Sequence, residues 1–220
     1  MKTGTDRLES LATAVAKAAP DFDEEQQRIA LEVYRRLAQG SPARASDVAE
    51  RAGTTVERVD ELLASWPGVF RDEDGRVIGF WGLTIGKLTP THSLEVDGHD
   101  LFAWCAWDTL FLPGILASTA RVQSACPTTG ETIFLVVSPG GVVETSHLEA
   151  VVSFLVPDRD FDADVIQSFC HFVHFFASEE AGEAWTNEHP ETFLLPLEEA
   201  FELGRLVNAL NFPTVLGGGR

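Results

Sequence analysis

Residues Leu101–Phe111, with the sequence LFAWCAWDTLF, place one thiol and one carboxylate within an apolar, aromatic stretch. A carboxylate taken out of water without a partner is costly, so Asp108 needs a reason to lie there. If residues 104–108 form the first turn of a helix, the spacing of three puts Cys105 and Asp108 on one face. Burial among Trp104, Trp107 and Phe102 would raise the pKa of both groups. An Asp that holds or shares a proton near neutral pH is a candidate general acid–base.

A structural interpretation of the same residues stays open. Cysteine is among the residues most often buried, and it then behaves as a small hydrophobe. Spacing alone favours this interpretation of Cys105.

Upstream of this stretch, residues 1–82 predict a winged-helix-like helical module. A short amphipathic helix at the start is followed by helices at residues 29–37, 46–52 and 55–66, the second capped by Ser46 and stopped at Gly53. Residues 68–82 then predict a β-hairpin that turns at Asp74-Gly75.

The candidate recognition helix, residues 55–66, has the wrong charge for DNA. It carries Arg58 alone against Glu57, Asp60 and Glu61, whereas a DNA reader offers Lys, Arg, Asn or Gln. We therefore expect this module to be structural.

Downstream, after Thr89-Pro90-Thr91, the composition shifts to mixed α and β, and we assign residues 83–220 to a second domain with antiparallel strands. A hairpin is predicted around residues 127–130, strands within 140–157, a helix capped by Ser178 and a closing helix after Pro196. Residues 167–177 predict an alternating strand with Cys170, Phe172 and His174 on one side. The fold class is α+β.

The totals exclude several classes of protein. The chain has 220 residues and a formal net charge of −18, which repels phosphate backbones and anionic lipid and so predicts no nucleic acid and no membrane. No stretch is long enough to cross a bilayer, and the acidic start does not resemble a signal peptide. We expect a cytoplasmic protein.

The three cysteines, Cys105, Cys126 and Cys170, would remain thiols in the cytoplasm. They form no CxxC pair, so neither a disulfide framework nor a zinc knuckle is indicated. A zinc site from Cys170, His171 and His174 is awkward, because on a strand His171 points away from the other two.

Two long motifs favour a functional role for the cysteines over a structural one. LFAWCAWDTLFLPGILASTARVQSACPTTG, residues 101–130, and QSFCHFVHFFASEEAGEAW, residues 167–185, resemble the bacterial organomercurial lyase (alkylmercury lyase) family. The resemblance runs from about residue 77 to 211, and more loosely over the helical module. It implies a winged-helix-like module that does not bind DNA, followed by a catalytic domain.

The resemblance also implies roles for individual residues. Cys105, Asp108 and Cys170 fall on the catalytic residues that hold mercury and carry the proton, and Cys126 falls on a structural cysteine. His171 stands where some members have a second adjacent Cys, which the family treats as dispensable. The apolar pocket for the organic group would be walled by Phe102, Trp104, Trp107 and Phe172.

The activity implied is protonolytic cleavage of the carbon–mercury bond of alkyl- and arylmercury compounds to a hydrocarbon and Hg(II). No cofactor is expected, because Hg(II) is part of substrate and product. Low-molecular-weight thiols of the cytosol or a mercuric reductase would accept the Hg(II). Two other hypotheses remain: a soft-metal binding protein without protonolysis, which would not need Asp108, and a winged-helix metal-responsive regulator, which the acidic recognition helix disfavours.

Overall fold

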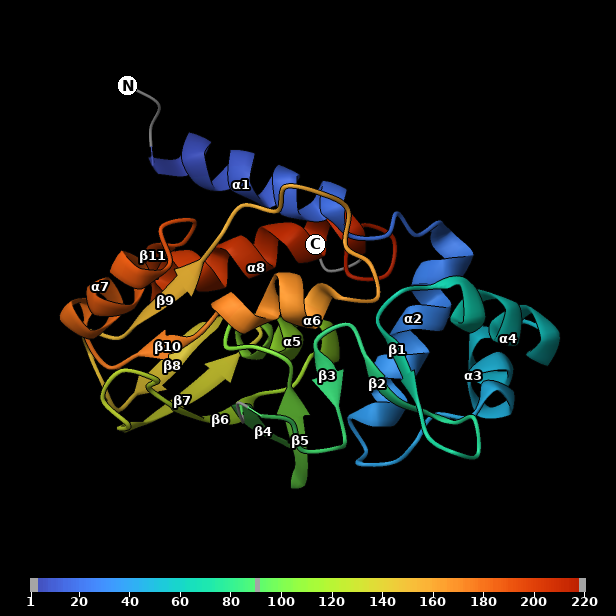
Figure 1. The fold of residues 1–220 in the computed structure, drawn as a ribbon. Helices are drawn as coiled ribbons and strands as arrows, with labels where there is room; N and C mark the ends of the chain where they lie inside the picture. Colours follow the sequence, from blue (N-terminus) through green and yellow to red (C-terminus); the bar gives the residue numbers. More distant parts are fainter. Residues whose placement is uncertain (1–3, 90–91, 218–220) are drawn as a thin grey trace.

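An eight-stranded antiparallel sheet carries the fold in the computed structural model, which describes residues 4–89 and 92–217 (Figure 1). Its strands lie in the order β1-β2-β3-β5-β4-β6-β7-β8, and a smaller sheet has the order β10-β9-β11. The strands are β1 (Val69–Arg71), β2 (Val77–Phe80), β3 (Leu83–Thr84), β4 (His92–Val96), β5 (His99–Ala103), β6 (Ala120–Ala125), β7 (Thr132–Ser138), β8 (Gly141–Thr145), β9 (Val151–Phe154), β10 (Phe175–Phe176) and β11 (Phe193–Pro196).

Helices flank the sheets at both ends of the molecule (Figure 1). They are α1 (Gly4–Ala18), α2 (Glu24–Leu37), α3 (Ala45–Ala52), α4 (Val56–Ser65), α5 (Asp108–Leu116), α6 (Val165–Ser168), α7 (Glu179–Glu188) and α8 (Leu197–Asn211), with a 3-10 turn at Cys170–Phe172. The predicted α+β class is confirmed.

The winged-helix-like outline is also confirmed. Helices α2, α3 and α4 precede the β1–β2 hairpin, whose turn contains Gly75 at φ +78°. The Thr55 side chain accepts a hydrogen bond from the Arg58 N–H at the start of α4, and Gly53 ends α3 in the left-handed conformation.

The predicted cap at Ser46 is wrong. Helix α3 begins one residue earlier, at Ala45, and its N-cap residue, Arg44, makes no side-chain cap. The backbone of Ala43 is bridged to Val77 of the hairpin, which fixes where the chain turns into the helix. The Ser46 hydroxyl instead donates to the Asp47 carboxylate at 3.2 Å.

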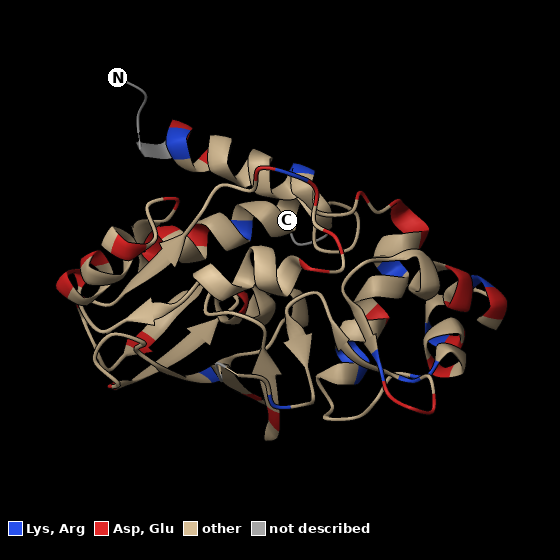
Figure 2. Ribbon diagram, in the orientation of Figure 1, with Lys and Arg blue, Asp and Glu red and all other residues tan. Residues whose placement is uncertain are grey.

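Acidic residues, coloured red on the ribbon in Figure 2, lie along α4 and α7. On α4, the one arginine is engaged within the module, because Arg58 Nε lies 3.1 Å from Glu25 Oε2 on α2. This charge pattern supports the prediction that the module is structural, which stays a prediction.

The boundary predicted between residues 82 and 83 is crossed by the sheet. Phe80 of β2 pairs with Leu83 of β3, and Leu83 pairs in turn with Ala103 of β5. Helix α1 packs along α8 rather than on the helical module (Figure 1). The boundary itself stays a prediction, and Pro90 and Thr91, where the composition shifts, lie outside the described residues.

Beyond the boundary most of the predicted elements are present. The hairpin of β6 and β7 turns through Gly130, Ser178 caps α7, and Pro196 precedes α8. In the part of the chain that the structure describes, no helix is long and apolar enough to span a bilayer.

The predicted strand over residues 167–177 is wrong. The chain forms α6 and then the 3-10 turn, in which the Phe172 N–H donates to the Phe169 carbonyl and the Val173 N–H to the Cys170 carbonyl. Only Phe175 and Phe176 pair with β9. Local turn hydrogen bonds have replaced the ladder, so Cys170 and His174 do not share a strand face.

Candidate active site

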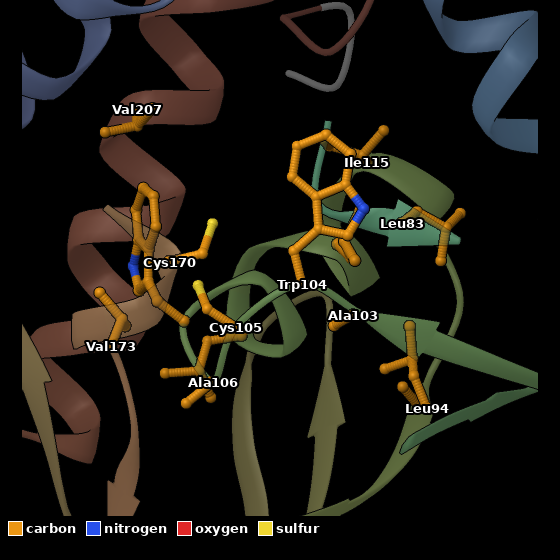
Figure 3. Packing of buried hydrophobic residues seen from close by; sticks show 14 of the residues in the cluster. Leu83, Leu94, Ala103, Trp104, Cys105, Ala106, Ile115, Cys170, Val173 and Val207 are labelled. Atoms are coloured by element: carbon orange, nitrogen blue, oxygen red, sulfur yellow. The ribbon is translucent and has the colours of Figure 1, made fainter. Parts of the chain in front are cut away.

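Two segments far apart in the sequence bring Cys105, Asp108 and Cys170 together. Cys105 lies in the connection between β5 and α5, Asp108 is the first residue of α5, and Cys170 opens the 3-10 turn. One ligand atom from each, two sulfurs and a carboxylate oxygen, lie within 4.8 Å of one another, and all three residues are buried. Figure 3 shows Cys105 and Cys170 side by side, with the Cys105 sulfur directed toward Cys170. We call these residues the thiol–carboxylate cluster.

The helix that presents Asp108 begins later than predicted. Residues 104–107 form bends and a turn, and α5 starts only at Asp108. The reason is that the Asp108 Oδ2 accepts a hydrogen bond from the Cys105 N–H at 2.8 Å, which closes a turn before the helix. The spacing of three still places the thiol beside the carboxyl.

A backbone hydrogen bond ties the two thiol segments together. The Ala106 N–H donates to the Val173 carbonyl at 3.2 Å. Ser153 of β9 fixes the other side of the 3-10 turn, because its hydroxyl donates to the Phe172 carbonyl at 2.7 Å. Cys170 is thus held against Cys105 from both directions.

All three pKa values are raised, and burial acts to raise each of them, whereas contacts within the cluster act in both directions. Burial raises the pKa of Asp108 to about 7, although hydrogen bonds from Cys105 oppose the shift. Burial also raises the pKa of Cys105 well above its usual value, as do its hydrogen bond to Cys170 and the Asp108 charge. For Cys170, the hydrogen bond with Cys105 lowers the pKa, but burial and Asp108 leave it raised. The cluster can therefore hold protons at neutral pH.

An apolar cavity of about 70 Å³ opens beside Asp108 and Cys170. Trp104 and Trp107, two of the predicted walls, line it; that the organic group lies there stays a prediction. The remaining walls come from both ends of the chain: Val15, Ala19, Pro20, Phe22, Tyr34, Trp81, Gly82, Phe111, Ile115, Phe161, Val165, Phe169, Val207, Asn208, Asn211 and Phe212.

Phe102 and Phe172, predicted as pocket walls, do not line this cavity. Phe102 lies on β5 between the buried residues Leu101 and Ala103, so strand alternation turns its ring to the opposite face. Phe172 follows Cys170 around the 3-10 turn and lines a separate hollow with Ser168. Nearness in sequence to the two thiols was not enough to place either ring.

Two residues beside Asp108 were missed by the sequence analysis. A Cβ added to Gly82 would lie 2.8 Å from the Asp108 Cγ, so only glycine leaves room for the carboxyl. Tyr34 of α2 lines the cavity and donates to the Trp81 carbonyl at 2.8 Å. The sequence shows Gly82 as the end of the hairpin, but nothing in it ties Tyr34 to the thiols.

Cys126 lies apart from this chemistry, in the turn between β6 and β7. Its N–H donates to the Glu131 carbonyl at 2.8 Å. Burial acts to raise the pKa of its thiol, but hydrogen bonds from the Thr129 hydroxyl and the Ala177 backbone outweigh it and lower the pKa. His171, in the 3-10 turn, has an exposed side chain. Neither residue joins the thiol–carboxylate cluster.

Two thiols and a proton-holding carboxyl beside an apolar cavity define a protein that handles a soft metal ion carrying an apolar group. Comparisons with known proteins agree. Residues 88–208 match the family model described as alkylmercury lyase, and residues 9–81 match the helix-turn-helix domain of alkylmercury lyase. The chain therefore belongs to the alkylmercury lyase family.

Individual relatives are similar over most of the chain. An alkylmercury lyase of Staphylococcus epidermidis is 46% identical over 178 residues, and one of Pseudomonas putida is 42% identical over 175 residues; each match covers 80% of both chains. A solved structure, the mercury-bound form of MerB2, superposes with a TM-score of 0.74 at 25% identity and covers 92% of this chain and 98% of that one.

Proposed function

We infer that the protein is an organomercurial lyase, which cleaves the carbon–mercury bond of alkyl- and arylmercury compounds by protonolysis and leaves Hg(II). The observation that carries this function is the approach of Cys105, Asp108 and Cys170 to within 4.8 Å in a buried site. Thiolates are the preferred ligands of a soft cation, and the carboxyl supplies the proton that the departing carbon needs.

The first step binds the substrate. The Cys105 thiol loses its proton to the Asp108 carboxylate and its sulfur bonds to the mercury of R–Hg⁺. The short path between the two groups supports this transfer, because the Cys105 N–H already holds the Asp108 Oδ2 at 2.8 Å. A pKa of about 7 lets Asp108 both accept and return a proton near neutral pH.

The second step weakens the carbon–mercury bond. Cys170 gives up its proton and its sulfur becomes the second ligand, which pushes electron density onto the carbon. Of the two thiol protons, one reaches that carbon through Asp108 and releases R–H, and the other leaves the site. Hg(II) stays bound to both sulfurs. Positioned proton transfer contributes roughly 10²–10⁴-fold to such a step.

The apolar cavity supports the choice of substrate. Trp104 and Trp107 offer aromatic walls beside Asp108 and Cys170, where the organic group would lie. Such walls exclude water from the reacting carbon.

Product release and location are further parts of the proposal. A mercury bridge between two buried thiolates needs an incoming thiol to displace it, so low-molecular-weight thiols or a mercuric reductase would take the Hg(II). The cytoplasm fits this exchange, since its reducing conditions also keep Cys105 and Cys170 as thiols. No resident cofactor enters the mechanism.

The test is hydrocarbon release from methylmercury by the purified protein with an added thiol and a chelator of hard metals. We expect methane in the headspace and one Hg(II) per turnover. Stoichiometric mercury binding without methane would instead identify a soft-metal binding protein. A DNA mobility shift at low salt would point to a regulator, which the pairing of Arg58 with Glu25 disfavours.

A further inference from the structure

The turn between β2 and β3 lies directly against the Asp108 carboxyl. Its two residues, Trp81 and Gly82, both have positive φ, +32° and +88°. A left-handed conformation is a genuine outlier for a bulky aromatic residue and persists only when the surroundings hold it. Something must therefore fix Trp81.

Three contacts fix this turn. The Tyr34 hydroxyl on α2 donates to the Trp81 carbonyl at 2.8 Å, and the Trp81 N–H donates to the Gly68 carbonyl at 3.2 Å. On the far side, the Gly82 carbonyl accepts from the Trp104 N–H at 3.0 Å. The turn thus links the helical module directly to the residue before Cys105.

Gly82 in turn shapes the space for the carboxyl. A Cβ at this position would lie 2.8 Å from the Asp108 Cγ and 2.9 Å from the Oδ1, closer than real contacts allow. The other carboxyl oxygen, Oδ2, is held by the Cys105 N–H. The carboxyl is therefore confined between the Gly82 backbone and the Cys105 backbone.

Tyr34 is buried and lies next to this arrangement. Its ring packs edge-on against Phe80, with centroids 5.0 Å apart, and lines the same cavity as Asp108. The other hydrogen bond of the Trp81 backbone is to Gly68, which lies between α4 and β1. The missing side chain of Gly68 also makes room for the indoles of Trp81 and Trp104.

We propose that Tyr34 and Gly82 are positioning residues for protonolysis: the Tyr34 hydroxyl holds the Trp81–Gly82 turn, and the bare Gly82 Cα lets Asp108 face the two thiols. The helix-turn-helix module is on this view part of the active site rather than an appendage. The inference rests on the proposed function, because it assigns the proton transfer to Asp108.

Gly82→Ala tests whether the missing side chain of Gly82 positions Asp108, and Gly75→Ala is its matched control. Gly75 has φ +78° but nothing within 4 Å of an added Cβ, so both variants strain the backbone and only one displaces Asp108. A misplacement near 1 Å costs about 10²-fold in rate. We expect single-turnover methane release to fall by about 10²-fold in Gly82→Ala and not in Gly75→Ala, while both bind one mercury per protein.

Tyr34→Phe tests the anchor, and it removes one oxygen from a side chain that otherwise fits. We expect kcat for methane release to fall roughly two- to tenfold, the change that corresponds to one hydrogen bond, with KM unchanged. Thr54→Val, which removes a hydroxyl bonded to Glu25 in the same module, should leave kcat unchanged.

The outcomes separate the two ideas. Equal kcat in Tyr34→Phe and the wild type, or equal loss in Gly82→Ala and Gly75→Ala, would overturn the positioning role while the wild type still releases methane. A loss confined to mercury binding would overturn it too. If Gly82→Ala does not fold, the Tyr34→Phe result decides.

Discussion

Two buried polar clusters lie close to the same stretch of chain, yet only one of the two lines the apolar cavity beside Asp108. The thiol–carboxylate cluster has pKa values raised by burial, and two of its members open onto apolar space. The second, which we call the histidine cluster, consists of His92, Ser124 and His174. His92 is paired with Ala103, two residues before Cys105, and His174 follows Val173, which binds Ala106.

The histidine cluster is hydrogen-bonded within the fold. The His92 Nδ1 lies 2.8 Å from the Ser124 Oγ, and the His174 Nε2 lies 2.8 Å from the His171 carbonyl. Burial lowers the pKa of His92 to about 3 and that of His174 to about 4. Neither ring lines the cavity beside Asp108. Of these two clusters of buried titratable groups, only the thiol–carboxylate cluster adjoins this space for a substrate, and it is therefore the candidate reaction site.

The strongest test of this contrast is Cys170→Ser. A hydroxyl is a poor ligand for a soft metal ion, and removing one member of a catalytic unit costs roughly 10⁴- to 10⁶-fold. We expect methane release from methylmercury to become undetectable in the headspace, and Cys105→Ser should behave alike. An active Cys170→Ser protein would remove this thiol from the mechanism.

Asp108→Asn should separate binding from chemistry. The amide can still accept from the Cys105 N–H but cannot take up and return an acidic proton, so release of hydrocarbon should fall by roughly 10²–10⁴-fold. Mercury should still bind at one equivalent per protein, measured by titration against free thiol. Full turnover would contradict the proton-carrier role.

The histidine cluster should act on stability rather than on turnover. Below pH 6.5 the unfolded histidines take up protons that the folded ones, with pKa values of about 3 and about 4, refuse. The contribution of these rings to the free energy of unfolding is therefore complete above pH 6.5. It falls as the pH decreases, by up to about 1.4 kcal/mol per pH unit for each ring. In urea unfolding between pH 6.5 and 4.5, the free energy of unfolding should depend less steeply on pH in His92→Asn than in the wild type, because one of the two rings is gone. Parallel wild-type and variant slopes would show that His92 is not the source.

Cys126→Ser should have the smallest effect. The thiol is buried in the turn after β6 and touches neither cluster's reacting atoms, so we expect a loss of about 1 kcal/mol in the free energy of unfolding. Methane release per folded molecule should match the wild type. Loss of turnover in a well-folded variant would mean that the third cysteine had been misassigned.

Local spacing predicted part of the site. The spacing of three from Cys105 to Asp108 predicted their contact, although the helix starts only at Asp108. The approach of Cys170 crosses 65 residues of chain, and no local pattern encodes it; it came from the family resemblance alone. Tyr34 escaped for the same reason, since its partner Trp81 is 47 residues away.

The errors have a common cause. The alternating pattern over residues 170–176 fits a strand, but turn hydrogen bonds to the Phe169 and Cys170 carbonyls formed instead. Ser46 looked like a helix cap until the Ala43–Val77 bridge moved the start of α3. In both places hydrogen bonds that the side-chain pattern does not reveal decided between local structures of similar propensity.

The pairing of β2 with β3 across residues 80–83 has an evolutionary consequence. Domains that are exchanged between unrelated genes need a linker at which they can be separated without unfolding either domain. Here separation would leave Leu83 of β3 without its partner strand β2. It would also remove Tyr34 from the Trp81–Gly82 turn next to Asp108. Exchange of either half alone would therefore disrupt both the sheet and the contact that supports Asp108.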